Sequence, residues 1–132
     1  MRIVVDSSAL VAIGTFEPDR PALIRAIETA SEILISPINY VETGVVLTGR
    51  GHFVSRQAFD EWLSNYRVRV AAEPAIDALA LDAYLTFGKG RHPARLNLAD
   101  CFAYALAKSL DAPLLYKGDD FRMTDVRSAL DV

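Results

Sequence analysis

The sequence predicts an α/β fold: a three-layer α/β/α sandwich around a central, mostly parallel sheet. Short β-branched runs alternate along the chain with amphipathic stretches of helical spacing, which is the order that βαβ units produce. About half of the 132 residues are apolar (52%) and 23% are charged, a balance typical of a globular protein with its own core. Because no repeat, low-complexity tract or linker interrupts the pattern, we expect one domain over residues 1–132.

The N-terminal half contains two candidates for buried strands. Residues 3–5 and 33–35 are short runs of β-branched and other apolar side chains. Between them, residues 21–32 show the apolar spacing of a helix. Ser36-Pro37 is typical of a helix start, a cap followed by proline at the first helical position. We expect that helix to end at Gly49 and to carry three apolar residues, Val41, Val45 and Leu47.

The C-terminal half continues the same alternation. In residues 55–66 three apolar side chains share one side of a helix, and Gly88 can terminate the helical stretch before it. The expected elements are helices at 55–66 and 75–87, a strand at 68–70, a helix from its cap Asn97 to residue 110, a strand at 113–116, and a short fifth strand around Val126.

Acidic residues follow two of the predicted strands. Asp6 ends the first strand, and Asp119 and Asp120 come shortly after the fourth. In open α/β sheets, ligands bind beyond the carboxyl ends of the strands, where the strand order reverses. If the order is 3-2-1-4-5, these acids meet in one crevice.

Two further acids stand within apolar helical stretches. Glu42 and Asp100 are each flanked mainly by apolar residues, where a lone ionised carboxylate is strongly unfavourable. Four carboxylates brought together would repel one another unless a cation neutralised them. A hard ion with oxygen ligands, Mg²⁺ or Mn²⁺, does so. The four acids therefore indicate a divalent metal site.

Each acid also has a purely structural explanation. Asp6 can form a turn with Ser8, and Glu42 can lie on a partly exposed helix face. Asp100 stands three residues after Asn97, the spacing of a capping pair. Asp119 and Asp120 can be turn residues. The sequence leaves these alternatives open, and only the combination of the four acids favours the metal site.

Four segments carry a family resemblance. Residues 5–10, 36–42, 96–102 and 115–121 resemble the acidic motifs of PIN-domain ribonucleases, and in particular those of the VapC toxins of bacterial toxin–antitoxin pairs. Residues 84–102 also resemble that subgroup. The likeness runs in the family's order and spacing from residue 3 to residue 124, so it implies a PIN-like fold over nearly the whole chain.

The resemblance implies a set of site residues. Asp6, Glu42 and Asp100 match the family's first three acids, and Asp120 matches the fourth, with Asp119 at the variable position before it. On this basis all four are expected to be catalytic, with Asp6, Asp100 and Asp120 as metal ligands. Two further positions, Ser8 and Asn97, match residues that support the site.

The implied activity is that of a magnesium-dependent endoribonuclease, with Mn²⁺ as a substitute. Such an enzyme hydrolyses RNA to 5′-phosphate and 3′-hydroxyl ends without a covalent intermediate, and Glu42 would bind a second ion or orient the attacking water. The implied partners are an RNA substrate, tRNA or rRNA among the options, a cognate antitoxin protein and a second copy of the chain. The alternatives are an acidic protein-binding module and a metal-dependent, phosphatase-like α/β enzyme.

Charge and composition exclude other classes. With 14 basic and 17 acidic residues (net charge −3), the chain is no uniformly basic nucleic-acid binder, although Lys89, Arg91 and Lys117 can form a local rim that holds phosphates. Cys101 is the only cysteine, so no internal disulfide and no cysteine zinc site is expected. No apolar run approaches the ~20 residues of a membrane span, and the start lacks the apolar region of a signal peptide, so we expect a cytoplasmic protein.

Overall fold

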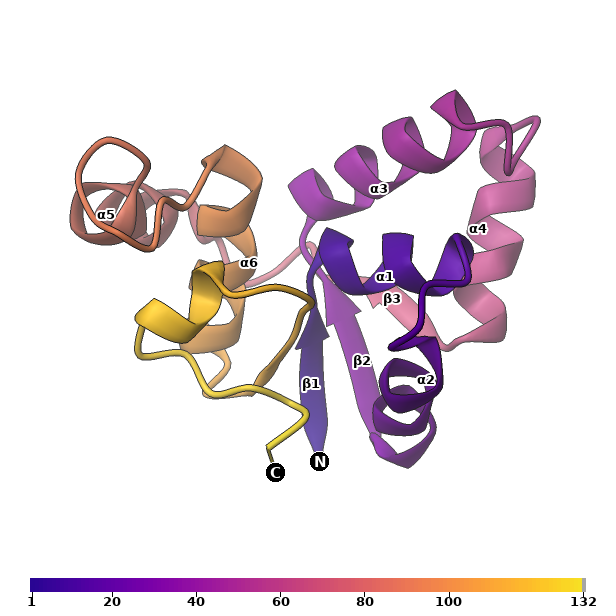
Figure 1. The fold of residues 1–132 in the computed structure, drawn as a ribbon, viewed down its shortest axis with the longest axis horizontal. Coiled ribbons are helices and arrows are strands. Elements are labelled where there is room, and N and C mark those ends of the chain that lie inside the picture. The colour runs from indigo at the N-terminus through magenta and orange to yellow at the C-terminus, as the bar shows by residue number, and fades with distance from the viewer. Residues whose placement is uncertain (132) are drawn as a thin grey trace.

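The computed structural model describes residues 1–131 and contains one four-stranded sheet flanked by helices (Figure 1). The strand order is β3-β2-β1-β4, and all three pairings are parallel. In chain order the elements are β1 (Arg2–Val5), α1 (Ser7–Gly14), α2 (Arg20–Thr29), β2 (Glu32–Ile35), α3 (Pro37–Gly49), α4 (Arg56–Asn65), β3 (Val68–Val70), α5 (Asp77–Phe87), α6 (Leu98–Ser109), β4 (Leu114–Leu115) and the 3₁₀ turn η1 (Asp120–Met123).

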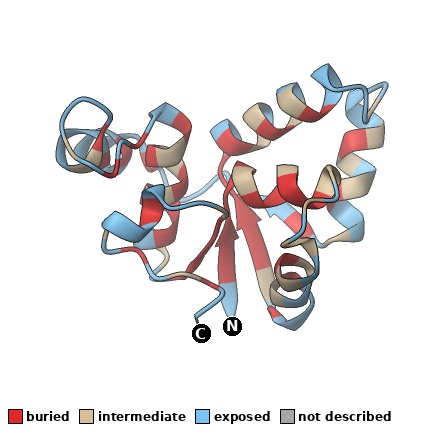
Figure 2. Ribbon diagram, in the orientation of Figure 1, coloured by how far each residue is buried: buried red, intermediate tan, exposed pale blue. Residues whose placement is uncertain are grey.

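The sheet separates two apolar cores, as the alternation of side chains along a strand requires. Val4 and Leu34 face the core built with α5 and α6, whereas Ile3 and Val5 face the core built with helices α1 to α4. In Figure 2 β1, β2 and β4 are mostly buried, whereas β3 has only Val68 buried, and helices lie on both sides of the sheet. The predicted three-layer α/β/α architecture is therefore confirmed.

Most predicted elements form close to their predicted bounds. Ser36 caps α3, Ser55 caps α4 and Asn97 caps α6, each accepting a hydrogen bond from a backbone N–H in the first turn. Gly88 follows the last residue of α5, as expected. Cys101 lies in the α5–α6 core, where burial raises the pKa of its thiol to about 11.

Four expectations about elements need correction. Residues 7–14 form a helix, α1, that the sequence pattern did not predict. The helix expected at 21–32 ends at Thr29, because Glu32 already begins β2 beside β1. The fourth strand is only Leu114–Leu115. Val126 lies in no strand, since the final segment meets β4 at a single bridge, Leu114 to Ser128.

The topology positions the acidic residues. β1 and β4 are direct neighbours, so the chain leaves both strands at the same edge of the sheet. In Figure 1 the start of α3 and the start of α6 lie on either side of that edge. Among residues 1–131, no helix combines the length and the apolar character that crossing a membrane requires.

Candidate metal centre

Asp6 lies at the end of β1 and caps α1. Its side chain is almost fully buried (3% exposed), and its Oδ2 accepts hydrogen bonds from the backbone N–H of Ser8 (3.0 Å) and from the Ser8 hydroxyl (2.6 Å). Burial raises the pKa of Asp6 to about 6, against the lowering effect of the Ser8 hydrogen bonds, and the nearby charge of Glu42 raises it further. The ionised form of Asp6 is therefore less favourable than that of an ordinary aspartate.

Ser8 connects the ends of two neighbouring strands. Its hydroxyl donates to Asp6 and accepts a hydrogen bond from the backbone N–H of Lys117 (3.0 Å), just after β4. The loop that carries Asp119 and Asp120 is thus joined directly to the end of β1. This contact fits the supporting position that the sequence suggested for Ser8.

Asp100 stands in the first turn of α6, beyond the end of β1. It forms a capping box with Asn97: the Asn97 backbone N–H donates to Asp100 Oδ2 (3.0 Å), and the Asp100 N–H donates to Asn97 Oδ1 (2.8 Å). The pKa of Asp100 is raised to about 7, first by burial and then by the negative charges of Asp6, Glu42 and Asp120. Capping alone would not bring three other acids near this carboxylate.

Glu42 and Asp120 complete the group from opposite sides. Glu42 is half-buried on α3, and Asp120 is exposed at the start of η1. Both raise the pKa of Asp100 through their charge. Asp119 behaves differently: its side chain is 92% exposed and pairs with Arg122 at 3.8 Å. Of the two adjacent acids, Asp120 is thus the one that interacts with the rest of the group.

The four acids fit a divalent cation in their chemistry. They are hard oxygen donors, and their negative charges disfavour the ionised forms of Asp6 and Asp100; a bound cation would reverse that penalty. Within residues 1–131, however, no three His, Cys, Asp or Glu side chains are positioned as a group that could hold a metal ion. Asp6 and Asp100 instead hold backbone N–H groups. We therefore describe these four residues, Asp6, Glu42, Asp100 and Asp120, as the acidic centre rather than as a closed set of ligands.

The sequence analysis missed one residue of this region, Asn39. It is fully buried in the first turn of α3, and its side-chain amide contacts Asp6 and the backbone of α6. A signal was present in the sequence: Asn39 stands three residues before Glu42, so both lie on the same face of the helix.

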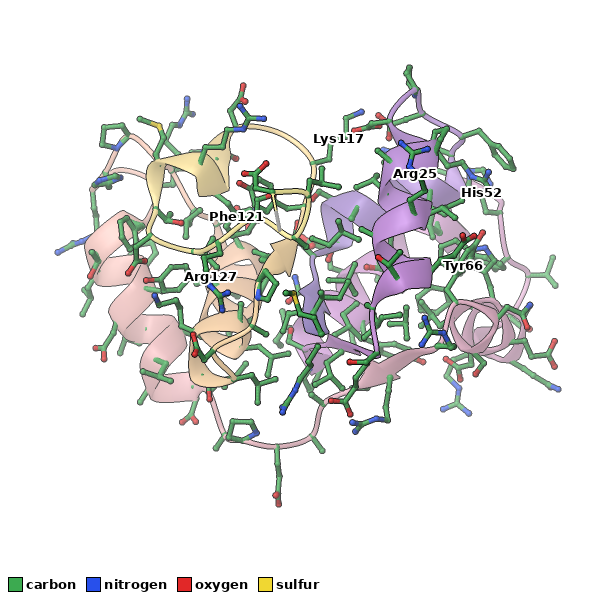
Figure 3. The ribbon with its side chains drawn as sticks, turned by 90° about the horizontal axis from the view of Figure 1, so that it is seen from below. Arg25, His52, Tyr66, Lys117, Phe121 and Arg127 are labelled. Atoms are coloured by element: carbon green, nitrogen blue, oxygen red, sulfur yellow. The ribbon has the colours of Figure 1, made fainter. Side chains whose placement is uncertain are left out.

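Of the three basic residues expected at the rim, two are exposed before α6 and the third is paired with acidic residues. Lys89 and Arg91 are exposed in the loop before α6, with the Arg91 guanidinium 6.0 Å from the Tyr84 ring centre and its Nε donating to the Leu85 carbonyl (3.2 Å). Lys117 is directed toward the segment between α1 and α2 (Figure 3), where its ammonium pairs with Glu17 and lies 3.6 Å from Asp19. The charge of Lys117 is therefore already partnered.

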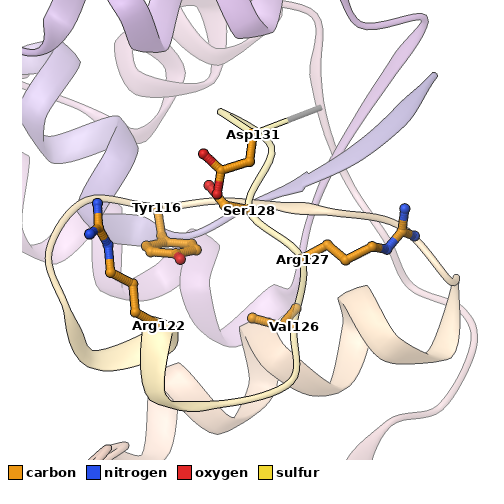
Figure 4. Close-up of a pocket in the computed structure, with 6 residues that line it drawn as sticks. All are labelled: Tyr116, Arg122, Val126, Arg127, Ser128 and Asp131. Carbon is orange, nitrogen blue, oxygen red and sulfur yellow. The ribbon is translucent and has the colours of Figure 1, made fainter.

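A separate cavity of about 470 Å³ lies on the C-terminal side of the fold (Figure 4). None of the four acids lines it; the lining residues are Tyr116, Arg122, Val126, Arg127, Ser128 and Asp131. Arg127 is held by the carbonyl of Asp111 (2.8 Å) and by its carboxylate (3.3 Å). The acidic centre is thus distinct from this cavity.

Comparisons with known proteins agree with this architecture. Residues 3–126 match the sequence model of the PIN domain family. The chain is 45% identical over 126 residues to a ribonuclease VapC of Mycolicibacterium smegmatis, a match that covers 94% of this chain and 97% of that protein. It is 43% identical over 125 residues to ribonuclease VapC30 of Mycobacterium tuberculosis, covering 94% and 95% of the two chains.

A solved structure shows the same fold. The crystal structure of Mycobacterium tuberculosis VapC20, described as a sarcin–ricin-loop-cleaving toxin, superposes with a TM-score of 0.68 over 95% of this chain and 98% of that one. The two sequences are 22% identical, so this likeness concerns the fold alone.

Proposed function

The chain belongs to the PIN-domain family as a VapC-type ribonuclease, the toxin of a toxin–antitoxin pair, and from that premise we propose a Mg²⁺-dependent endoribonuclease acting through the acidic centre. The family's nucleases use a divalent metal ion. In our proposal Asp6, Asp100 and Asp120 bind the Mg²⁺ ion, and Mn²⁺ can substitute for it. We further propose that residues 1–132 form a single nuclease domain, since the family match spans 3–126 and both cores share one sheet.

The observation that supports this proposal most strongly is the electrostatic state of Asp100. Burial raises the pKa of its carboxyl, and the negative charges of three other acids, at the end of β1, on α3 and in η1, raise it further. A fold has no structural need for such an arrangement, because the negative charges of nearby carboxylates repel one another. A divalent cation bound there neutralises charge on the phosphoryl oxygens and makes a bound water more acidic.

The remaining groups of the centre have distinct proposed roles. Glu42, half-buried on α3, would bind a second ion or orient the attacking water. Ser8 keeps the Asp6 carboxylate oriented and joins it to the loop that carries Asp120. Asn97 holds the first turn of α6 through the capping box and thereby fixes the backbone of Asp100.

The proposal is tested by cleavage of an RNA pool by the purified chain. We expect internal cuts with Mg²⁺ or Mn²⁺, and no cuts with EDTA or in the Asp6→Asn variant. The matched control is Asp119→Asn, which removes an equal charge from an exposed acid next to the centre. Full cleavage with EDTA and by Asp6→Asn would rule out the metal mechanism. No cleavage under any of these conditions would instead reopen the phosphatase-like and protein-binding alternatives.

Family membership implies an RNA substrate and a cognate VapB antitoxin. We propose that Lys89 and Arg91, exposed before α6, hold RNA phosphates beside the centre. A structured RNA such as tRNA or rRNA is the proposed target, and its location makes the cytoplasm the proposed site of action. We also propose that an arginine of the antitoxin pairs with the acids and competes with the metal ion.

A homodimer is the remaining proposal about partners. Val41 and Val45 on α3 are 57% and 65% exposed, and Leu98 at the start of α6 is 71% exposed, so apolar side chains flank the acidic centre on both sides. Exposed apolar surface of this kind favours association. Light scattering should give a dimer for the wild type and a monomer for Leu98→Glu. A wild-type monomer at all concentrations would contradict the dimer.

A further inference from the structure

Asn39 occupies the point where three segments of the acidic centre meet. Its side chain is fully buried, and its Nδ2 lies within hydrogen-bond distance of three acceptors from two other segments. The acceptors are Asp6 Oδ1 (3.4 Å), Ser7 Oγ (3.2 Å) and the carbonyl oxygen of Ala99 (3.1 Å). One side chain therefore joins the end of β1, the start of α3 and the start of α6.

The orientation of this carboxamide is determined by its surroundings. The Ser36 hydroxyl donates to Asn39 Oδ1 and accepts from the Asn39 backbone N–H (3.1 Å). On the other side, the Ala99 carbonyl and the Asp6 carboxylate can only accept. The opposite orientation would set the amide oxygen against these two oxygens, so the NH₂ group faces them.

Each of the three joined segments carries an acid of the centre. Asp6 is contacted directly, Glu42 follows Asn39 by one helical turn, and Asp100 follows Ala99 in the chain. The Asp6 carboxylate is held on one oxygen by Ser8 and on the other by Asn39. These contacts fix both the spacing of the segments and the orientation of the most buried acid.

We propose that Asn39 is a positioning residue of the acidic centre: its carboxamide sets the spacing of Asp6, Glu42 and Asp100 and thereby the affinity for the divalent ion. The inference rests on the proposed nuclease function and extends it to a residue that touches neither metal nor substrate in that scheme. Groups that orient metal ligands typically contribute about 10–100-fold to metal affinity or activity.

The test compares Asn39→Ala with a matched control, Thr43→Val. Thr43 is also fully buried on α3 and donates to the Asn39 carbonyl (2.7 Å), but within residues 1–131 its side chain forms no hydrogen bond to any of the four acids. Mn²⁺ binding is measured by calorimetry without RNA, and kcat and KM for RNA cleavage are measured at several Mn²⁺ concentrations. We expect Asn39→Ala to bind Mn²⁺ at least about tenfold more weakly, and Thr43→Val to stay within about twofold of wild type.

The cleavage activities of Asn39→Ala and Thr43→Val should differ in the same way as their Mn²⁺ affinities. Asn39→Ala is expected to need more Mn²⁺ for half-maximal kcat, with little change of KM, and circular dichroism should show a folded chain. A folded Asn39→Ala with wild-type Mn²⁺ affinity would overturn the positioning role. If Asn39→Ala does not fold, the same titration on Asn39→Ser decides, because a serine hydroxyl is too short to reach Asp6 and Ala99 together.

Failure of the underlying function gives a different result. If the wild type neither binds Mn²⁺ nor cleaves RNA, the nuclease mechanism proposed for the acidic centre is wrong. If the wild type does both and Asn39→Ala matches it, only the role of Asn39 is wrong.

Discussion

The two ends of the acidic centre are built in opposite ways. At the β1–α3 end, Asp6 and Asn39 are buried and every polar atom described above has a hydrogen-bond partner within the fold. At the η1 end, Asp119 and Asp120 are exposed on a short turn, and within residues 1–131 the only ion pair of Asp119 is with Arg122 at 3.8 Å. We call these the buried end and the exposed end.

The contrast teaches how a cluster of like charges is tolerated in a small fold. The buried end fixes one carboxylate rigidly, at the expense of a raised pKa for Asp6. The exposed end keeps its acid solvated, so that Asp120 adds charge to the centre at little cost to folding. In the scheme proposed here, the buried end supplies the fixed ligand, and the exposed end adjusts to the ion and the RNA.

The largest expected effect of this difference is on cleavage. Asp6→Asn should reduce kcat/KM more than the 10–100-fold typical of losing a mere supporting contact, and Asp120→Asn by about tenfold. Asp119→Asn should stay within about twofold, since Asp119 points to Arg122. Initial rates on one RNA at saturating Mg²⁺ give the three values. A larger loss for Asp119→Asn than for Asp120→Asn would reverse the assignment of the fourth acid.

An intermediate effect is expected on stability against pH. The pKa values of Asp6 (about 6) and Asp100 (about 7) lie above the usual value of 3.8. At a pH between the usual value and these raised values, the folded chain therefore binds more protons than the unfolded chain. Without metal, stability should therefore be greatest near the usual pKa and fall as pH rises toward 7, by about 1–3 kcal/mol.

Urea unfolding in EDTA at about pH 5 and pH 7.5 measures this fall. Asp6→Asn and Asp100→Asn should each reduce it, whereas Asp119→Asn at the exposed end should leave it unchanged. The hydrogen bond from Lys117 lowers the pKa of Glu17, and the hydrogen bond from Tyr104 lowers the pKa of Asp125. These two residues therefore lose their contribution to stability only at more acidic pH and do not affect this comparison. A wild type that is more stable at about pH 7.5 than at about pH 5 would contradict the burial of charge at Asp6.

The smallest expected effect concerns the basic rim. Arg91→Ala should weaken RNA binding a few-fold. The slope of the logarithm of the binding constant against the logarithm of salt concentration should become shallower by about 0.7, the change expected for the loss of one phosphate contact to a single strand. Lys117→Ala should change binding less, because its ammonium already pairs with Glu17 and Asp19. Binding by Asp6→Asn at several salt concentrations separates these effects from cleavage. Equal losses for both variants would show that the Lys117 ion pair opens for RNA.

Local sequence signals predicted most of the fold because they are strong and periodic. The caps Ser36, Ser55 and Asn97 mark helix starts through a single short side chain, and each predicted start was confirmed. The missed helix α1 has the same kind of cap, Asp6, but we interpreted that residue as the end of the first strand and a metal ligand, with a turn as the alternative. After its two serines the helix contains no polar residue on its exposed side, so no amphipathic stripe marked it.

Long-range contacts explain what the sequence did not predict. Nothing near Lys117 in the chain indicates that its charge pairs with Glu17, and nothing near Val126 indicates that the final segment makes only one bridge to β4. For the adjacent Asp119 and Asp120, the family resemblance selected Asp120, and the charge that Asp120 exerts on Asp100 from the start of η1 supports that selection. The role of the four acids remains a prediction of the sequence that the fold supports by bringing their charges together.

The most direct test of the central claim is diffraction from crystals grown with Mn²⁺, using its anomalous signal to locate the ion. We expect a peak at the carboxyl edge of β1 and β4, with oxygens of both Asp6 and Asp100 within about 2.5 Å of it. The same crystals of Asp6→Asn should lack the peak. An ion bound elsewhere, with Asp6 and Asp100 still holding only their backbone N–H groups, would contradict a metal-binding role for the acidic centre.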